Sequence, residues 1–330
     1  MKEHKAQWLA DGTLGLMVHH IVDPKGATHA EKTWELNRVI NAFDLDSFIQ
    51  QFDESGANWL IFTFGQCTQY FCSPNAWLDS IEPGHGSERD LMREIGERVH
   101  GMGKKLITYL PVGIPIPVEG YTPGPFRGGT HDPLFLDLYG CWLRSYSNSL
   151  GRLSDGWWFD GVLDFTNRYM TNWQAFCDDA RAGNPDAIVA LNDDNFCNGI
   201  EQPVSPYQDY LAGEVEILED SQLQFGHIID EPYQDEKGRW RERGKAPLPL
   251  LMPTCQYLNG VQWHALAPVD CRFSSKVSDH YYTDDELIKF VADCKAVKGA
   301  VTFNLPVELD GNIPEKSLKQ FSRVSKAVLG

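Results

Sequence analysis

An aromatic segment of the sequence ends in a single carboxylate. Residues 156–160 read Gly-Trp-Trp-Phe-Asp, and a glycine follows Asp160. An unpaired charge is costly to bury, so an acidic residue here is seldom present for packing alone; the structural alternative is an aspartate that caps the next helix. A carboxylate between aromatic walls is typical of a glycosidase nucleophile, which attacks the anomeric carbon while the rings stack on the sugar. Asp160 is therefore the candidate nucleophile.

A retaining glycosidase needs a second carboxyl group roughly 5–5.5 Å from the nucleophile. Glu214 ends the segment 209–214, Asp-Tyr-Leu-Ala-Gly-Glu, and is the first candidate for the acid/base. Carboxylates that end two strands of one barrel face the same mouth, so Asp160 and Glu214 are expected to converge. The structural alternative for Glu214 is a surface residue at the start of a loop. The other candidates for the acid/base are Glu216, Asp164, Asp230 and Glu231.

Two adjacent histidines, His19 and His20, follow the first apolar segment. Neighbouring residues of a strand point to opposite faces, so one of them can face a site and the other is expected in the core. Metal hydrolases place two imidazoles on one face with His-x-His spacing, which is absent here. A metal-dependent hydrolase or isomerase that pairs one of them with His264 stays an alternative. The leading interpretation needs neither a metal nor a cofactor.

Eight short apolar segments are expected to position these residues. Most are continuously apolar, as parallel strands buried on both faces are. Together with intervening helical patterns they predict an α/β fold, a (β/α)8 TIM-like barrel. The alternative, an open doubly wound sheet, requires a glycine-rich turn after the first strand, where this sequence has His19 and His20. The expected strands are Leu14–His19, Trp59–Phe64, Lys105–Leu110, Gly156–Phe159, Ala187–Leu191, Tyr210–Glu214, Val261–Leu266 and Ala300–Leu305.

Helical patterns lie between several of the expected strands. Ser87 is a candidate cap for one of these helices, and Thr283 opens another with a capping box to Glu286. Residues 216–249 are polar and replace a helix, which predicts a long functional loop over the barrel mouth. No linker divides the chain, so residues 1–330 are expected to form a single domain. The expected helices are Asp44–Ser55, Glu88–Gly101, Phe135–Leu150, Thr171–Ala182, one that starts at Thr283, and Lys316–Leu329.

Active sites of such barrels lie at the C-terminal ends of the strands. The polar and aromatic residues at or near these ends form the predicted substrate-binding set. Its members are His19, His20, Gln66, Cys67, Tyr109, Trp158, Asn192, Trp263 and His264.

The composition limits the partners. The 330 residues carry a formal net charge of −17 without a cluster of Lys and Arg, which argues against nucleic acid and anionic membranes and favours a neutral sugar. No apolar run is long enough to span a membrane. The start lacks a signal-peptide core, which predicts a cytoplasmic protein as the sequence stands, and a secreted or periplasmic one if a signal was removed. The eight scattered cysteines indicate mostly reduced core thiols. The sequence indicates no oligomeric state.

Several segments resemble the α-L-fucosidase family, glycoside hydrolase family 29. Residues 15–20, Gly-Leu-Met-Val-His-His, are similar to its G-L-F-I-H-W-G, and residues 158–161 to the W-F-D-G motif whose aspartate is the nucleophile. Residues 192–194 resemble N-D-R, and residues 43–63 and 298–314 resemble two further motifs of the family. The resemblance runs in order over residues 14–314. It implies a (β/α)8-like barrel with Asp160 as nucleophile; the β-sandwich that often follows in the family is not expected here.

Two departures from the family concern the substrate and the acid/base. The family's K-H-H-D-G-F, whose histidines hold fucose, aligns with residues 65–70, where Gln66 and Cys67 replace both histidines. The family's acid/base glutamate often lies in W-E-x-C, which aligns with residues 252–255, where no glutamate is present. We expect a retaining glycoside hydrolase that removes a terminal neutral sugar, with weak activity on simple α-L-fucosides. The alternative is a carbohydrate-binding pseudoenzyme.

Overall fold

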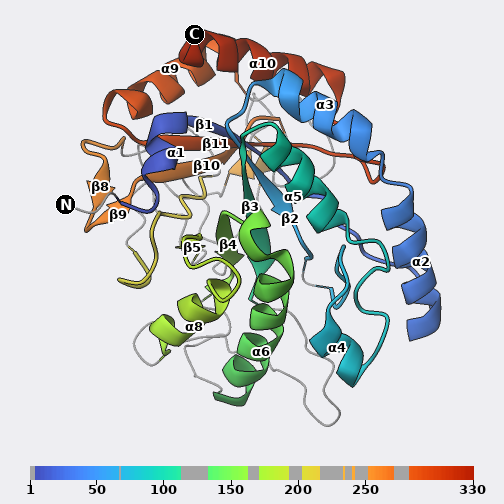
Figure 1. The fold of residues 1–330 in the computed structure, drawn as a ribbon. Helices are drawn as coiled ribbons and strands as arrows, with labels where there is room; N and C mark the ends of the chain where they lie inside the picture. Colours follow the sequence, from blue (N-terminus) through green and yellow to red (C-terminus); the bar gives the residue numbers. More distant parts are fainter. Residues whose placement is uncertain are drawn as a thin grey trace.

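A parallel seven-stranded sheet forms the centre of the protein in a computed structural model of the chain (Figure 1). The structure describes residues 4–66, 68–112, 133–162, 171–192, 203–215, 233–234, 240–241, 252–270 and 282–330. The strand order is β10-β11-β1-β2-β3-β4-β5. The strands are β1 (Leu14–Val18), β2 (Trp59–Thr63), β3 (Lys105–Pro111), β4 (Gly156–Asp160), β5 (Ile188–Leu191), β10 (His264–Pro268) and β11 (Ala300–Leu305).

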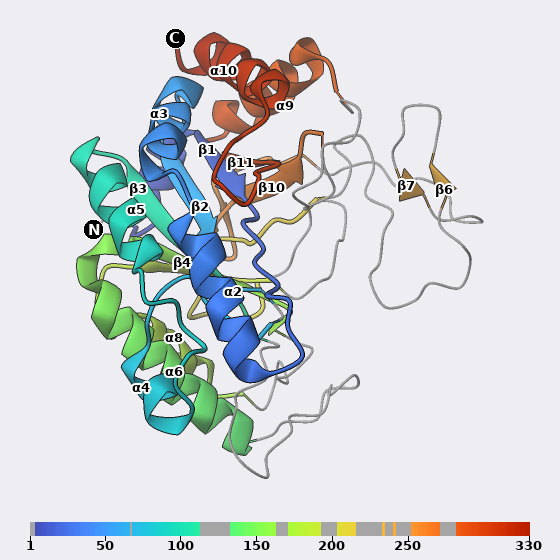
Figure 2. The ribbon, with the colours of Figure 1, turned by 90° about the vertical axis from the view of Figure 1, so that its right-hand side faces the viewer.

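Most helices lie along the outer face of the sheet, whereas the short α1 buries Leu9 in one cluster with Met17 and Trp59 of the inner layer. Figures 1 and 2 place α9 and α10 near β10, β11 and β1, and α6 and α8 near β4 and β5. No helix in the described part of the chain is both long and apolar enough to cross a membrane. The helices are α1 (Gln7–Gly12), α2 (His29–Asn41), α3 (Leu45–Ser55), α4 (Ala76–Ile81), α5 (Leu91–Gly101), α6 (Pro133–Leu150), α8 (Trp173–Ala180), α9 (Asp284–Ala296) and α10 (Glu315–Leu329).

Local side-chain chemistry sets the helix starts. Thr283 caps α9 in the predicted capping box, because its side chain accepts from the Glu286 amide while the Glu286 side chain accepts from the Thr283 amide. The prediction of Ser87 as the cap of α5 is wrong. Asp90 caps this helix by accepting from the Arg93 amide, and Ser87 instead donates to the Arg89 carbonyl.

The predicted sixth strand, Tyr210–Glu214, is not a regular strand. It makes isolated parallel bridges from Tyr210 to Gln262 and from Glu214 to Leu266. Gly213 interrupts it with a φ of 67°, and a Cβ added there would lie 1.9 Å from the His264 carbonyl oxygen. The segment still lies between β10 and β5, because the Asp209 amide donates to the Val189 carbonyl at 2.8 Å. The arrangement is consistent with a TIM-like barrel, although no continuous ladder closes the described strands.

The predicted seventh strand, Val261–Leu266, is divided in two. Its first residues form β9 (Val261–Gln262), which pairs with β8 (Tyr257–Leu258) as an antiparallel hairpin. Asn259 and Gly260 form the turn with φ values of 51° and 83°, the conformation that Asn-Gly favours between two strands. Only after Trp263 does β10 join the sheet, so the strand runs from His264 to Pro268.

Most of the predicted loop at 216–249 lies outside the described residues. Within it, β6 (Tyr233–Gln234) and β7 (Trp240–Arg241) form a two-stranded antiparallel ribbon. Figure 2 shows this ribbon apart from the central sheet.

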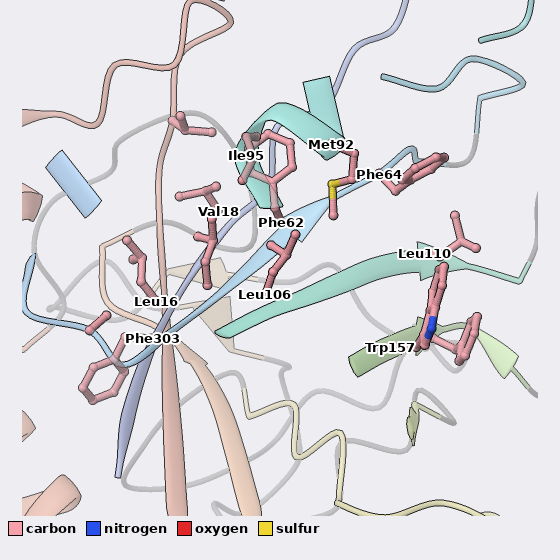
Figure 3. Close-up of a cluster of buried hydrophobic side chains, with 14 of the residues drawn as sticks. Leu16, Val18, Phe62, Phe64, Met92, Ile95, Leu106, Leu110, Trp157 and Phe303 are labelled. Carbon is pink, nitrogen blue, oxygen red and sulfur yellow. The ribbon is translucent and has the colours of Figure 1, made fainter. Parts of the chain in front are cut away.

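Two buried layers explain why the strands are apolar throughout. Alternate residues of each strand face the helices, and the residues between them face the interior enclosed by the sheet. Figure 3 shows part of the outer layer, in which Leu16, Val18 and Phe62 of the strands pack with Met92 and Ile95 of α5. Burial of each such side chain contributes about 1.5–3 kcal/mol. Each strand therefore has one face that stabilises the helices and one that can carry a site.

The cysteines agree in part with the expectation of reduced core thiols. The five described cysteines are free; Cys72, Cys177 and Cys294 are buried, whereas Cys141 and Cys255 are exposed. Burial raises the pKa of Cys72 and of Cys177 to about 12, so these two thiols are unreactive near neutral pH.

Candidate active site

The inward face of the sheet ends in polar side chains. Trp158 belongs to the inner layer, and Asp160 follows two residues later at the end of β4. The same spacing relates Asn192 to Ala190 after β5 and Glu214 to Ala212. Because side chains of a strand alternate, an inner apolar residue predicts an inner polar residue two positions on. The polar set therefore gathers at one end of the sheet, the C-terminal end of its strands.

Asp160 accepts two hydrogen bonds, one on each carboxylate oxygen. The Tyr109 hydroxyl donates to Oδ2 at 2.5 Å, and the Asn192 amide donates from Nδ2 to Oδ1 at 2.8 Å. The carboxylate is partly exposed rather than sealed in the core. Two donors fix the orientation of the carboxylate plane, which suits a nucleophile.

Asn192 also holds Glu214. Its Nδ2 donates to Glu214 Oε2 at 2.6 Å, so the two hydrogens of one amide nitrogen serve two carboxylates. The distance from Asp160 Oδ1 to Glu214 Oε2 cannot exceed the sum of these two bonds, 2.8 Å and 2.6 Å. These two oxygens are therefore no further apart than a retaining glycosidase requires, which is roughly 5–5.5 Å between its two carboxyl groups.

Tyr109 connects the end of β3 with Asp160 and Gln66. Gln66 Oε1 lies 3.2 Å from its hydroxyl, whose single hydrogen is taken by the shorter contact to the carboxylate. Burial, reinforced by the nearby Asp160 carboxylate, raises the pKa of Tyr109 well above 10. The hydroxyl therefore stays protonated and acts as a permanent donor to Asp160.

His19 lies at the inner end of β1, beside Tyr109. The two rings meet edge to face with centroids 4.8 Å apart, and His19 Nδ1 lies 3.0 Å from Asn304 Oδ1. Burial lowers the pKa of His19 below 6.5, against the opposing effects of the Asn304 hydrogen bond and the Asp160 charge. A neutral imidazole thus borders the site. Thr302 of β11 faces inward, so Asn304, two positions further on, faces inward as well and could have been predicted as the partner of His19.

Trp158 lies beneath the carboxylates rather than beside them. Its ring stacks on Tyr109 with centroids 5.3 Å apart, and its Nε1 donates to the Ala212 carbonyl at 3.2 Å. Only 1% of its surface is exposed. Trp158 therefore supports Tyr109 from below, and the predicted role as an open stacking surface for sugar is not what its position favours.

His20 does not belong to the site. It points to the outer layer, where its ring lies 5.0 Å from Phe43 and 5.6 Å from Phe62, and its Nε2 lies 3.0 Å from the Leu309 carbonyl. Its prediction as a substrate-binding residue is wrong, because the next residue along an extended chain faces the other side. Burial lowers the pKa of His20 to about 4.

Trp263 and His264 also lie away from the carboxylates. Since β10 starts at His264, both residues are at the opposite end of the sheet from the site. His264 faces the Leu211 and Ala212 carbonyls with Nδ1 and the Thr302 hydroxyl with Nε2, and burial lowers its pKa to about 4. The sequence placed these residues at the wrong end because it began the strand three positions early.

Cys67 and the other candidates for the acid/base, Glu216, Asp164, Asp230 and Glu231, lie outside the described residues.

The metal-dependent hydrolase or isomerase alternative pairs His19 or His20 with His264. The structure does not support this pair, because His264 and His20 point away from the inner end of β1. In the described part of the chain, the one cluster of histidine and acidic side chains that could hold a metal is His29, Glu82 and His85, in other segments.

Comparisons with known proteins agree with this architecture. No protein-family model and no curated protein sequence matches the chain significantly. Among solved structures, α-L-fucosidase isoenzyme 1 from Paenibacillus thiaminolyticus is 17% identical, with a TM-score of 0.60 over 98% of this chain and 74% of that one. An α-L-fucosidase of glycoside hydrolase family 29 from Bacteroides thetaiotaomicron is 12% identical, with a TM-score of 0.62 over 99% of this chain and 73% of that one.

A second glycoside hydrolase family is equally similar. The endo-fucoidan hydrolase MfFcnA4 from family 107 is 14% identical, with a TM-score of 0.64 over 97% of this chain, which spans about half (53%) of that protein's length. Identities this low show the fold alone, and they do not single out family 29. The chain thus has a glycoside hydrolase fold of the kind found in α-L-fucosidases and endo-fucoidan hydrolases.

Proposed function

We propose that the protein is a retaining glycoside hydrolase with Asp160 as nucleophile and Glu214 as acid/base. The observation that carries this proposal is the Asn192 amide, which donates to both carboxylates and limits their separation. The similar structures, named as fucosidases and fucoidan hydrolases, support a carbohydrate substrate. We also infer a closed eight-stranded barrel in which residues 209–215 take the place of the sixth strand.

The reaction proceeds by double displacement. A carboxylate oxygen of Asp160 attacks the anomeric carbon as the bond to the leaving oxygen breaks and Glu214 transfers its proton to that oxygen. Glu214, now a carboxylate, then takes a proton from water. The resulting oxygen nucleophile attacks the anomeric carbon, the bond to Asp160 breaks, and the free sugar leaves with its configuration retained. Tyr109 and Asn192 hold the nucleophile between the two steps.

The proposed substrate is a glycoside with a terminal neutral sugar. The net charge of −17 disfavours uronates and sulfated sugars, which carry negative charge. Gln66, which contacts Tyr109, presents an amide where the resembled family has a histidine. A site built to hydrogen-bond particular hydroxyls rejects sugars whose groups do not match, so simple α-L-fucosides are expected to be poor substrates.

The proposal is tested by kinetics of two variants on aryl α-L-fucoside and on aryl galactosides, arabinosides and rhamnosides. On the best substrate, Asp160→Asn should lose about 10³-fold or more in rate, because no other group can form the covalent bond. Glu214→Gln should lose much more on glycosides with poor leaving groups than on activated aryl glycosides, which need little protonation. Glu97→Gln, which removes an exposed carboxylate from α5, is the matched control and should retain full activity.

Two results would contradict the assignment. Near-full activity of folded Asp160→Asn would exclude it as nucleophile, and an equal loss of Glu214→Gln on both substrate types would exclude acid/base catalysis by Glu214. Sugar binding by the wild-type protein without hydrolysis of any activated glycoside would support the carbohydrate-binding alternative.

A further inference from the structure

Two histidines and a glutamate from separate segments meet outside the candidate active site. His29 begins α2, Glu82 follows α4, and His85 lies between α4 and α5. The ligand atoms of the three side chains all lie within 4.8 Å of one another. His85 is buried, His29 is partly buried, and the Glu82 side chain is 48% exposed. The cluster is therefore buried on one side and accessible to solvent on the other.

Both ring nitrogens of His85 face hydrogen-bond acceptors, although a neutral imidazole can donate from only one of them. Nδ1 lies 2.9 Å from the Gln69 carbonyl oxygen, and Nε2 lies 2.8 Å from Glu82 Oε2. Both oxygens are acceptors, whereas a neutral imidazole has a single N–H. With Nδ1–H donated to the carbonyl, the Nε2 lone pair points at a carboxylate. Either a proton or a metal cation must stand between these two atoms.

The backbone carbonyl of Gln69 gives His85 the partner that metal-bound histidines typically have. Such histidines donate their second ring N–H to a carbonyl or carboxylate, which fixes the tautomer and the ring orientation. His29 has a comparable partner, since its Nε2 lies 2.9 Å from the Pro83 carbonyl, which can only accept a hydrogen bond. Its Nδ1, 2.9 Å from the Tyr70 hydroxyl, then keeps the lone pair that a metal ligand needs.

We propose that His29, Glu82 and His85 bind one divalent transition-metal ion of the Zn²⁺ class through one ring nitrogen of each histidine and a Glu82 carboxylate oxygen. Two imidazoles and one carboxylate are a typical ligand set for Zn²⁺, which leaves a fourth position for water. Ca²⁺ and Mg²⁺ prefer sites made of oxygen ligands. The ligand types therefore discriminate between these classes of cation.

The ion has a structural role that reaches the candidate active site. The loop after β2 carries Gln66, which contacts Tyr109, and Gln69, whose carbonyl accepts from His85. Phe71, at the end of this loop, bridges both Gly65 and Gly86. An ion at the cluster joins the start of α2 and the end of α4 to this loop.

The experiment is a calorimetric titration of the EDTA-treated full chain with Zn²⁺ alone. We expect one Zn²⁺ per chain and a higher Tm in its presence. Glu82→Gln and His29→Gln should each weaken binding by about tenfold or more, since even loss of an outer partner of a metal ligand has such effects. His4→Gln, which removes a histidine outside the cluster, should bind Zn²⁺ as the wild type does. Ca²⁺ should not bind at the cluster.

Circular dichroism of the two partly exposed variants verifies that they are folded. Absence of stoichiometric Zn²⁺ binding, or unchanged affinity in folded Glu82→Gln and His29→Gln, would overturn the proposal; Ca²⁺ binding that these variants abolish would overturn the metal class. Asp160→Asn should bind Zn²⁺ like the wild type, so failure of the proposed hydrolase activity and failure of this site are separate results.

Discussion

At the scale of single residues, Asn192 is the one that relates the two carboxylates. Each carboxylate receives one hydrogen from the same nitrogen, at 2.8 Å for Asp160 and 2.6 Å for Glu214. An aspartate at this position would replace two donors with a third negative charge. The chemistry proposed here depends on a neutral amide at position 192, which can donate to ionised Asp160 and to Glu214 without adding a charge between them.

Removal of the Tyr109 hydroxyl tests the second donor to Asp160. We expect Tyr109→Phe to lower kcat/KM by roughly ten- to a hundredfold, because hydrogen bonds to charged groups are worth about 1.5–3 kcal/mol. Tyr146→Phe is the matched control, since Tyr146 is equally buried but donates to the Ser73 carbonyl. The control should lose stability without losing activity. Equal activity of both variants would show that Tyr109 does not act on the nucleophile.

The residues of the site could be predicted where the sequence indicates which strand positions face inward. Asp160, Glu214, Asn192, Tyr109, Gln66 and His19 come together. His20 fails because two adjacent histidines cannot share a face, and an apolar strand flanked by layers on both sides gives no sign of which one turns inward. Asn304 lies next to His19 and could have been chosen from Thr302, the inward-facing residue two positions earlier in β11.

At the scale of elements, the segment that carries Glu214 has the least regular backbone. Gly213 has a φ of 67°, and its Cα approaches the His264 carbonyl so closely that an added Cβ would lie 1.9 Å from it. A glycine is needed there both for its conformation and for the close approach. Despite the irregular backbone, Glu214 bridges Leu266 in the same register as Tyr210 and Gln262, and it ends beside Asn192.

Gly213→Ala should therefore reduce both stability and activity. The left-handed conformation alone costs about 1–2 kcal/mol for an L-residue, and the clash adds to this by shifting Glu214. Gly103→Ala is the matched control, because Gly103 has a φ of 70° with nothing within 4 Å of an added Cβ. Urea unfolding should show a larger loss for Gly213→Ala, and only this variant should lose kcat. Similar behaviour of both variants would contradict the role of the close approach.

Element types were more predictable than element boundaries. The capping box at Thr283 was found from its spacing, and the same spacing from Thr28 to Glu31 marks the start of α2, which the sequence analysis did not use. The Asn-Gly turn at 259–260 joins β8 to β9 in a hairpin that ends before β10. The sequence does not show where the hairpin ends and β10 begins, because the residues on both sides of Trp263 are buried.

At the scale of the whole molecule, two buried histidines make stability depend on pH. Burial lowers the pKa of His20 and of His264 to about 4. In the unfolded chain each has a pKa of about 6.5, so the unfolded state binds protons first as the pH falls. The folded state is therefore destabilised between pH 6.5 and 4, by on the order of 3 kcal/mol for each histidine.

Urea unfolding at pH 7, 5.5 and 4.5 measures this loss. His20→Phe should flatten the pH dependence, because its ring can pack against Phe43 and Phe62 without taking up a proton. His4→Gln should keep the dependence of the wild type. Stability that is unchanged between pH 7 and 4.5, or a His20→Phe variant with the wild-type slope, would contradict the assignment of two neutral buried imidazoles.

The alternation of the strands has a consequence for how this protein can diverge. The side chains that meet the carboxylates and those that hold the helices are adjacent in sequence but are separated by the thickness of the sheet. A combinatorial library restricted to inward positions at the strand ends, such as 19, 63 and 304, leaves the outer packing layer in its original composition. Laboratory evolution toward a new sugar can therefore sample the site at little expense to the scaffold, whereas a single-residue insertion in any strand exchanges its two faces.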